Sequence, residues 1–259
     1  MSGAAGTKGA SMHPLLEEIY ASGKVTDAGG AAHDAFPAAL AREDGELLTR
    51  VTRETGASEV LEIGMACGVS TLCLLDGLPP GAGRVTSIDP YQDDWFDGIG
   101  RVNVNRAGFS ARHVCMERFS HEVLPEFLRD GRRFDLVFID GNHRFEHTLV
   151  DFYYAFRLVP AGGHLLFHDV YWLPSVRKVL AYILRSDIAV ESVPAFMPPA
   201  PRRLPRVAEH LWAMVREPRQ PLTALTLRQH SFYNVAVLRK TAEQDEIGFS
   251  ATWDHYRGC

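Results

Sequence analysis

The stretch that decides the fold reads Val60-Leu61-Glu62-Ile63-Gly64-Met65-Ala66-Cys67-Gly68-Val69-Ser70-Thr71. Its apolar first half is typical of a buried strand, and its second half predicts a glycine-punctuated turn that opens a helix. At such a turn the backbone can approach a ligand closely, and the first N–H groups of the helix face it. The glycine spacing is Gly-x-x-x-Gly and no Gly-Lys-Ser/Thr follows, so a dinucleotide fingerprint and a phosphate loop are both disfavoured.

Short apolar runs alternate with longer helical patterns beyond this turn, which is typical of a parallel sheet flanked by helices. The expected strands are 59–63, 84–88, 111–116, 134–139, 163–167, 188–193 and 232–238. Because parallel strands need crossover connections, the helical patterns between them fit this arrangement. We predict an α/β fold with a doubly wound, mostly parallel seven-stranded sheet, N-terminal helices and a late insertion.

The chain is expected to form a single domain over residues 13–259. Residues 1–12 are Gly-, Ala- and Ser-rich without an apolar period, which predicts a disordered tail. Helical patterns predict an N-terminal helical lid over 13–55, followed by a ligand-binding core over 59–172. The Pro-rich stretch 194–230 is interpreted as an insertion and not as a second domain.

Composition and charge exclude several classes of protein. The 259 residues are 46% hydrophobic, and 27 Lys and Arg against 32 Asp and Glu give a net charge of −5, which disfavours nucleic acid as a partner. No apolar run reaches the roughly 18 residues of a membrane helix and no secretory signal is evident, so we expect a cytoplasmic protein without membrane contact. Cys67, Cys73, Cys115 and Cys259 lack CxxC spacing and are expected to be reduced thiols.

Polar residues end three of the core strands, at the edge where doubly wound sheets bind ligands. Asp89 ends the second core strand, Asp140 and His143 follow the fourth, and His168 and Asp169 follow the fifth. A carboxylate at the position of Asp89 can accept two hydrogen bonds from a ribose diol, which argues for a nucleoside-bearing cofactor. Carboxylates that end apolar strands are costly to bury unless they are paired, ligated or hydrated, so Asp140 and Asp169 are candidate functional groups.

With these motifs the sequence resembles the class I S-adenosylmethionine-dependent methyltransferases over roughly residues 40–172. Within that class it is similar to small-molecule O-methyltransferases of the catechol and macrolide-sugar types. The resemblance implies a Rossmann-like methyltransferase fold that binds S-adenosylmethionine (SAM), with Asp89 on the ribose. Phe119 stands where many relatives carry an acid that contacts adenine. The residues that the resemblance assigns to the cofactor are Glu62, Gly64, Met65, Gly68, Ser70, Thr71, Asp89 and Asp140.

The resemblance also implies a reacting centre at Asp140, His143 and Asp169. Methyl transfer from a sulfonium is an in-line displacement, so the protein must align the acceptor oxygen and remove its proton. Imidazole suits this task at neutral pH, which makes His143 the candidate base, although a loop histidine that caps the next helix is the alternative. Catechol-type enzymes hold magnesium with an Asp-Asn pair at the fifth strand, but here that pair reads Asp169-Val170 and His168 precedes it. Asp140 and Asp169 are therefore candidate Mg²⁺ ligands in an incomplete site, and a centre without metal stays open.

We predict a SAM-dependent O-methyltransferase that acts on a hydroxyl of a small molecule, for example a secondary metabolite, sugar or phenol. The resemblance makes a homodimer a reasonable expectation. Two alternatives stay open. One is methylation of RNA or protein, which the net charge disfavours. The other is a SAM-binding scaffold or rearrangement catalyst without methyl transfer, which the departures at His168 and Val170 keep in view.

Overall fold

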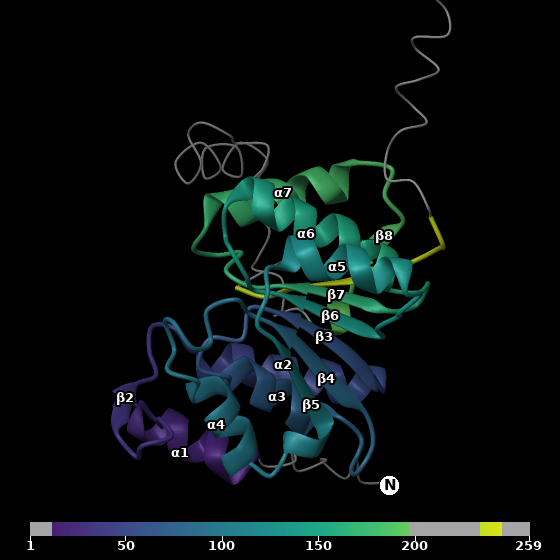
Figure 1. Cartoon of the computed structure of the whole chain (residues 1–259). Coiled ribbons are helices and arrows are strands. Elements are labelled where there is room, and N and C mark those ends of the chain that lie inside the picture. Colours follow the sequence, from purple (N-terminus) through teal and green to yellow (C-terminus); the bar gives the residue numbers. More distant parts are fainter. Residues whose placement is uncertain (1–11, 197–233, 245–259) are drawn as a thin grey trace, which may run out of the picture.

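The computed structural model describes residues 12–196 and 234–244, and its central feature is one seven-stranded sheet (Figure 1). The strand order is β5-β4-β3-β6-β7-β9-β8. The strands are β3 Glu59–Ile63, β4 Arg84–Ile88, β5 His113–Met116, β6 Leu136–Ile139, β7 His164–Phe167, β8 Val190–Ser192 and β9 Ala236–Lys240. Pairing is parallel from β5 through β7, whereas β9 runs antiparallel to both β7 and β8. The predicted doubly wound, mostly parallel sheet is confirmed.

Helices lie on both sides of this sheet and give the molecule three layers (Figure 1). The lower layer in the view contains α1 Pro14–Ser22, α2 Arg42–Thr55, α3 Val69–Gly77 and α4 Ile99–Arg106. The upper layer contains α5 Ser120–Arg129, α6 Phe145–Leu158 and α7 Pro174–Arg185. Two short 3-10 turns complete the elements, η1 Ser110–Arg112 and η2 Pro194–Phe196.

The sheet separates two hydrophobic cores, and successive strand residues alternate between them. Val60 and Phe138 pack with the lower helices, whereas Leu61 and Ile139 pack with the upper ones. Successive side chains of a strand point to opposite faces, and both faces here are covered. The central strands therefore read as nearly continuous apolar runs, which is why they could be predicted from the sequence.

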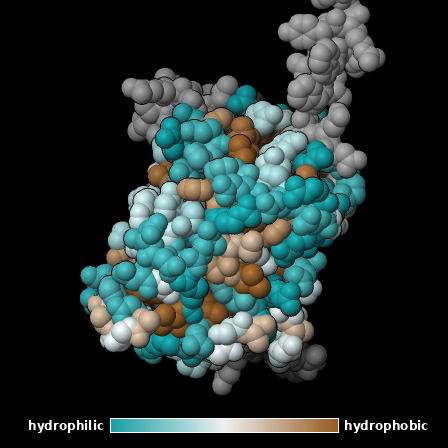
Figure 2. All heavy atoms as spheres, viewed as in Figure 1, coloured by the Kyte–Doolittle hydropathy of each residue, from teal (hydrophilic) through white to brown (hydrophobic). Residues whose placement is uncertain are grey.

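The outer surface in the same view is mostly hydrophilic, with small groups of hydrophobic side chains near its top, middle and lower left (Figure 2). Trp95 and Trp172 are the most exposed large hydrophobic residues in the described part of the chain, at 69% and 68%. Within residues 12–196 and 234–244, no helix is both long enough and apolar enough to cross a membrane.

The N-terminal segment 13–55 contains the helices α1 and α2 and, between them, strands that the sequence did not predict. Between its two helices lies an antiparallel hairpin of β1 Lys24–Thr26 and β2 Ala32–Asp34. The Asp27 carboxylate accepts a hydrogen bond from the Ala31 N–H, at 2.9 Å, and helps to close the turn. Strands of three residues are too short to show a period of two, so the sequence pattern gave no sign of them. The role of this segment as a lid stays a prediction.

Other differences from the predicted elements are shifts of a few residues. The strand predicted over 111–116 begins only at His113, because Ser110–Arg112 forms η1. The last strand, predicted over 232–238, is β9 and lies later in the chain. The predicted tail, except for residue 12, and the predicted insertion beyond residue 196 lie outside the described residues. The single-domain organisation stays a prediction.

Candidate functional site

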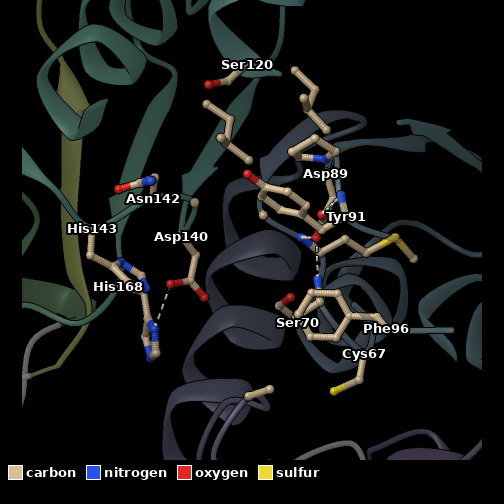
Figure 3. Close-up of a pocket in the computed structure, with 18 of the residues that line it drawn as sticks. Cys67, Ser70, Asp89, Tyr91, Phe96, Ser120, Asp140, Asn142, His143 and His168 are labelled. Carbon is tan, nitrogen blue, oxygen red and sulfur yellow. Dashed lines mark hydrogen bonds and ion pairs between the residues drawn. The ribbon is translucent and has the colours of Figure 1, made fainter. Parts of the chain in front are cut away.

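A cavity of about 470 Å³ opens at the carboxyl ends of the central strands. Doubly wound folds bind ligands at this edge of the sheet. One wall, here called the turn side, consists of residues 63–67, 69–70, 88–91 and 95–96, and the opposite wall, the His–Asp side, consists of residues 140–143 and 168–169. Figure 3 shows Asp89 and Ser70 on the turn side facing Asp140, His143 and His168 across the cavity. The sequence therefore predicted both walls of one site.

Asp89 holds the glycine turn in place. Its Oδ2 accepts hydrogen bonds from the backbone N–H groups of Met65 and Ala66, at 2.9 and 2.8 Å, and its Oδ1 accepts one from Tyr91 N–H at 2.9 Å. The side chain is buried yet lines the cavity. Each carboxylate oxygen has two lone pairs, so Oδ1 can accept a further hydrogen bond from a ligand.

Two buried amides hold the same turn from its other face. Gln92 Nε2 donates to the Ala66 carbonyl at 2.8 Å, and Asn103 Nδ2 donates to the Cys67 carbonyl at 2.9 Å. Both side chains are fully buried. The turn is therefore rigid before any ligand arrives. Sequence reasoning missed both residues, because an isolated Gln or Asn carries no recognisable motif.

Gly64 brings the turn into contact with the His–Asp side. Its φ is +91°, and an added Cβ would lie 2.1 Å from the backbone oxygen of Asp140. Only glycine fits there, because other residues are strained at this φ and would clash with the backbone of Asp140 and Gly141, just after β6. Gly68, at φ +81°, makes a similar close approach to Gly100 and does not line the cavity.

Glu62 and Thr71 lie beneath the turn and not on the cavity wall, contrary to their predicted place among the cofactor ligands. The fully buried Glu62 accepts hydrogen bonds from Thr71 Oγ1 at 2.6 Å and Ser87 Oγ at 2.5 Å. Burial raises the pKa of Glu62 to about 7, although hydrogen bonds from these hydroxyls and Ser70 oppose the shift. The physical reason is strand alternation, which points Glu62 toward α3 instead of toward the strand end.

The predicted residues that do line the cavity are Gly64, Met65, Ser70, Asp89, Asp140, His143 and Asp169. Aromatic residues that the sequence analysis did not assign join them. Tyr91 stacks on Trp95 with ring centroids 4.0 Å apart, and Phe119 meets the Tyr91 ring edge-on at 5.9 Å. The aromatic run that follows Asp89 was the signal in the sequence that could have identified Tyr91 and Trp95, whereas Phe119 had been noted only as a departure from the family pattern.

His168 is the centre of the His–Asp side. Its Nδ1 lies 3.0 Å from Asp140 Oδ1, and its Nε2 lies 3.4 Å from Asp44 Oδ2. Burial by itself lowers the pKa of His168, but the neighbouring carboxylates of Asp140, Asp44 and Asp169 outweigh burial and raise it to about 10. His168 is therefore an imidazolium at neutral pH, with both ring N–H groups available as donors.

His143 and Asp169 form a second pair beside His168. His143 Nε2 lies 3.5 Å from Asp169 Oδ2, and the His143 side chain is 39% exposed. Asp169 has φ +56°, an uncommon conformation for a non-glycine residue that is often found at functional sites. Burial raises the pKa of Asp169. Ser175 Oγ donates to the backbone carbonyl of His143 at 2.5 Å and so helps to fix the loop.

Asp140, His143 and Asp169 each offer one donor atom to a common point, and these atoms lie within 4.8 Å of one another. Carboxylate oxygens with an imidazole nitrogen suit a divalent cation. The donor set thus fits a metal ion, but the imidazolium of His168 already lies against Asp140 and opposes a second positive charge there.

The strand order with an antiparallel β9, the glycine turn after β3 and the acid that ends β4 define the class I methyltransferase fold. Residues 61–170 match a family described as "Methyltransferase domain". The resemblance to methyltransferases inferred from the sequence is therefore confirmed over these residues.

Two relatives illustrate the match. Catechol O-methyltransferase of Mycobacterium tuberculosis is 33% identical over 132 residues, 51% of this chain and 57% of that protein. Tricin synthase 2 of Oryza sativa subsp. japonica is 30% identical over 140 residues, 52% of this chain and 45% of that protein. The chain thus spans about half the length of the curated relatives it matches.

Two solved structures share the fold over more of the chain. TomG of Streptomyces achromogenes, an O-methyltransferase in tomaymycin synthesis solved with SAM, has a TM-score of 0.59 at 19% identity and covers 91% of this chain and 93% of its own. The O-methyltransferase of Bacillus cereus, solved with SAH, has a TM-score of 0.56 at 22% identity and covers 72% and 85%.

Proposed function

We propose that this chain transfers a methyl group from SAM to a hydroxyl of a small molecule. The observation that carries the proposal is the pairing, across one cavity, of a rigid glycine turn held by Asp89 with the His143–Asp169 pair. Of the relatives and structures named above, one is by name a catechol O-methyltransferase and TomG is an O-methyltransferase in tomaymycin synthesis, which supports the choice of acceptor class.

The turn side fits the cofactor. Asp89 Oδ1 is able to accept a hydrogen bond from a ribose hydroxyl, and Gly64 lets the backbone of the turn pack directly against that of Asp140. Tyr91 and Phe119 line the cavity near Asp89 and Ser120, where their rings suit a nucleobase. When bound, SAM supplies an electrophilic methyl group on a positively charged sulfur.

The His–Asp side supplies the remaining chemistry. His143 accepts the proton of the acceptor hydroxyl on the ring nitrogen that does not face Asp169, while Asp169 Oδ2, 3.5 Å from Nε2, orients the imidazole and stabilises the positive charge that it gains. The negative charge of Asp140 is offset by the imidazolium of His168, which lies 3.0 Å from it. General-base catalysis of this kind contributes about 10² to 10⁴ in rate.

The proposal is tested by incubating the purified protein with methyl-labelled SAM and a panel of catechol, a polyhydroxylated flavone, a sugar glycoside and RNA. We expect label on a hydroxyl of one of the small molecules. Label on RNA would support the rival reading as a nucleic-acid methyltransferase. Tight SAM binding with no labelled product from any acceptor would contradict methyl transfer. It would favour the alternative of a SAM-binding scaffold or rearrangement catalyst that transfers no methyl group.

Mg²⁺ belongs to this proposal as a second component, held by Asp140 and Asp169 with His143 as a third donor. Such an ion would stabilise the deprotonated acceptor oxygen. Because His168 already places a positive charge beside Asp140, we expect chelation by EDTA to lower turnover by less than about tenfold. Complete loss of turnover with EDTA, restored by Mg²⁺, would show that the metal is essential. The homodimer and the cytoplasmic location stay predictions.

A further inference from the structure

We propose that Asp44, on helix α2, is a positioning residue of the transfer site, because it anchors the far nitrogen of His168 and thereby holds His168 against Asp140. The inference deepens the proposed function and rests on it. Asp44 was not among the residues that the sequence predicted, and it lies 124 positions before His168 in the chain.

The geometry is a continuous line of polar contacts. Asp44 Oδ2 lies 3.4 Å from His168 Nε2, and His168 Nδ1 lies 3.0 Å from Asp140 Oδ1. Asn234, just before β9, donates from Nδ2 to the same Asp44 oxygen at 2.7 Å. Asn234 Nδ2 also lies 2.9 Å from His168 Nε2, but both atoms are donors when His168 is an imidazolium, so Asp44 Oδ2 is the acceptor that both of them face. Three segments that are distant in the sequence thus fix one imidazole ring.

Burial makes this line of contacts strong. Asp44 is 7% exposed and Asn234 is 6% exposed, and the His168 side chain is 11% exposed. A carboxylate buried to this degree is costly unless it is paired and hydrogen-bonded. Asp44 meets that requirement through His168 and Asn234. Removing Asp44 would leave the buried polar groups of His168 and Asn234 that face it without this acceptor.

Helix α2 shows that Asp44 is not simply a capping residue. Asp44 lies in the first turn of the helix, where acids commonly bond their own N-terminal N–H groups, but its carboxylate contacts His168 and Asn234 instead. The next residue, Gly45, packs so closely that an added Cβ would lie 2.2 Å from Tyr20 Oη. The helix is therefore seated tightly against α1, and Asp44 points in a fixed direction.

The consequence concerns Asp140, the acid of the cavity wall that His168 contacts directly. A base and its supporting groups must stay within a fraction of an ångström of their working geometry, and a misplacement of 1 Å can cost about 10² in rate. Without Asp44, the His168 ring is free to turn away from Asp140. Asp140 on the His–Asp side then loses the contact that holds its carboxylate in place. Cofactor binding, which relies on the turn side, should be spared.

The test compares Asp44→Ala and Asp44→Asn with Glu43→Gln, a matched control that removes a negative charge from an exposed position in the same helical turn. SAH affinity is measured by calorimetry, and kcat is measured with the acceptor that the unaltered protein methylates. We expect Asp44→Ala to lower kcat by about tenfold or more, while SAH affinity stays within about twofold. Asp44→Asn keeps an acceptor oxygen for His168 and should recover part of the loss. Glu43→Gln should match the unaltered protein.

A crystal structure of Asp44→Ala with SAH gives a readout that does not depend on activity. We expect His168 to leave hydrogen-bond distance of Asp140. An unchanged His168–Asp140 contact, or a kcat equal to that of the unaltered protein, would overturn the inference while leaving the proposed function intact. If the unaltered protein binds SAH but methylates nothing, the proposed function fails instead, and the crystal structure alone decides whether Asp44 positions His168.

Discussion

The two walls of the cavity are built in different ways. The turn side is held by bonds between side chains and backbone: Asp89 binds two N–H groups of the turn, and Gln92 and Asn103 bind two of its carbonyls. The His–Asp side is held by contacts between titratable side chains, with His168 at their centre. The comparison teaches that one wall is rigid with a fixed pattern of hydrogen bonds, whereas the other depends on charge.

The largest effect is expected where the two walls touch. In Gly64→Ala, the new Cβ would lie 2.1 Å from the Asp140 carbonyl oxygen at a φ that disfavours alanine. We expect the free energy of unfolding to fall by about 3 kcal/mol or more and SAM binding to disappear. Gly162→Ala is the matched control, because its φ of +90° is nearly the same but nothing lies within 4 Å. It should cost only about 1 to 2 kcal/mol. Chemical denaturation measures both, and equal losses would show that the contact with Asp140 is unimportant.

On the His–Asp side, His143→Ala should lower turnover by about 10² to 10⁴ and leave SAH affinity unchanged. The reason is that His143 faces the cavity beside Asp169 but makes no contact with the turn. Steady-state kinetics and calorimetry separate the two effects. His164→Ala, at the start of β7 and therefore at the opposite edge of the sheet, is the control. Unchanged turnover in His143→Ala would remove this histidine from the mechanism.

On the turn side, Asp89→Ala should weaken SAM binding by about tenfold to a hundredfold, which corresponds to a buried hydrogen bond to a charged group of about 1.5 to 3 kcal/mol. Turnover at saturating SAM should change far less, because the base lies on the other wall. Asp94→Ala removes an exposed acid from the same loop and serves as the control in calorimetry. Equal SAM affinities for the Asp89 and Asp94 variants would contradict the ribose role.

The last prediction concerns the pH dependence of stability, which comes from Glu62 beneath the turn and not from either cavity wall. Burial raises the pKa of Glu62 to about 7 from its ordinary value of 4.5, so the folded protein holds this proton more tightly than the unfolded chain does. The free energy of unfolding should therefore fall as pH rises from about 4.5 to 7, by up to about 3 kcal/mol. In Glu62→Gln this slope should be reduced, while the pH dependence of turnover stays the same. Identical slopes in denaturation curves of the two proteins would contradict the shift.

Much of the turn side could be predicted from the sequence, and the reason is local. The run from Val60 to Thr71 contains a strand, a turn and a helix in one stretch, and Asp89 follows the neighbouring strand directly. Glu62 and Thr71 were predicted to contact the cofactor, but they lie beneath the turn and do not line the cavity. Which face of a strand a residue occupies depends on how the sheet is covered.

Less of the His–Asp side could be predicted. Asp140 and Asp169 were recognised because they end buried strands and His143 through the family resemblance, and the structure brings one ligand atom of each within 4.8 Å of the others. Asp44 and Asn234 left no trace in the sequence, since their significance comes only from contact with His168. The same carboxylate contacts raise the pKa of His168 to about 10, so that its buried ring is positively charged at neutral pH.

The sequence by itself determined the sheet, the order of strands and helices along the chain and the polar residues at the strand ends, because hydrophobic periodicity and turn chemistry are properties of short segments. Only the tertiary structure decided which of those polar groups meet and what charge they carry. Burial and pairing shift protonation through distances of a few ångströms, and such distances between remote segments exist only once the chain has folded.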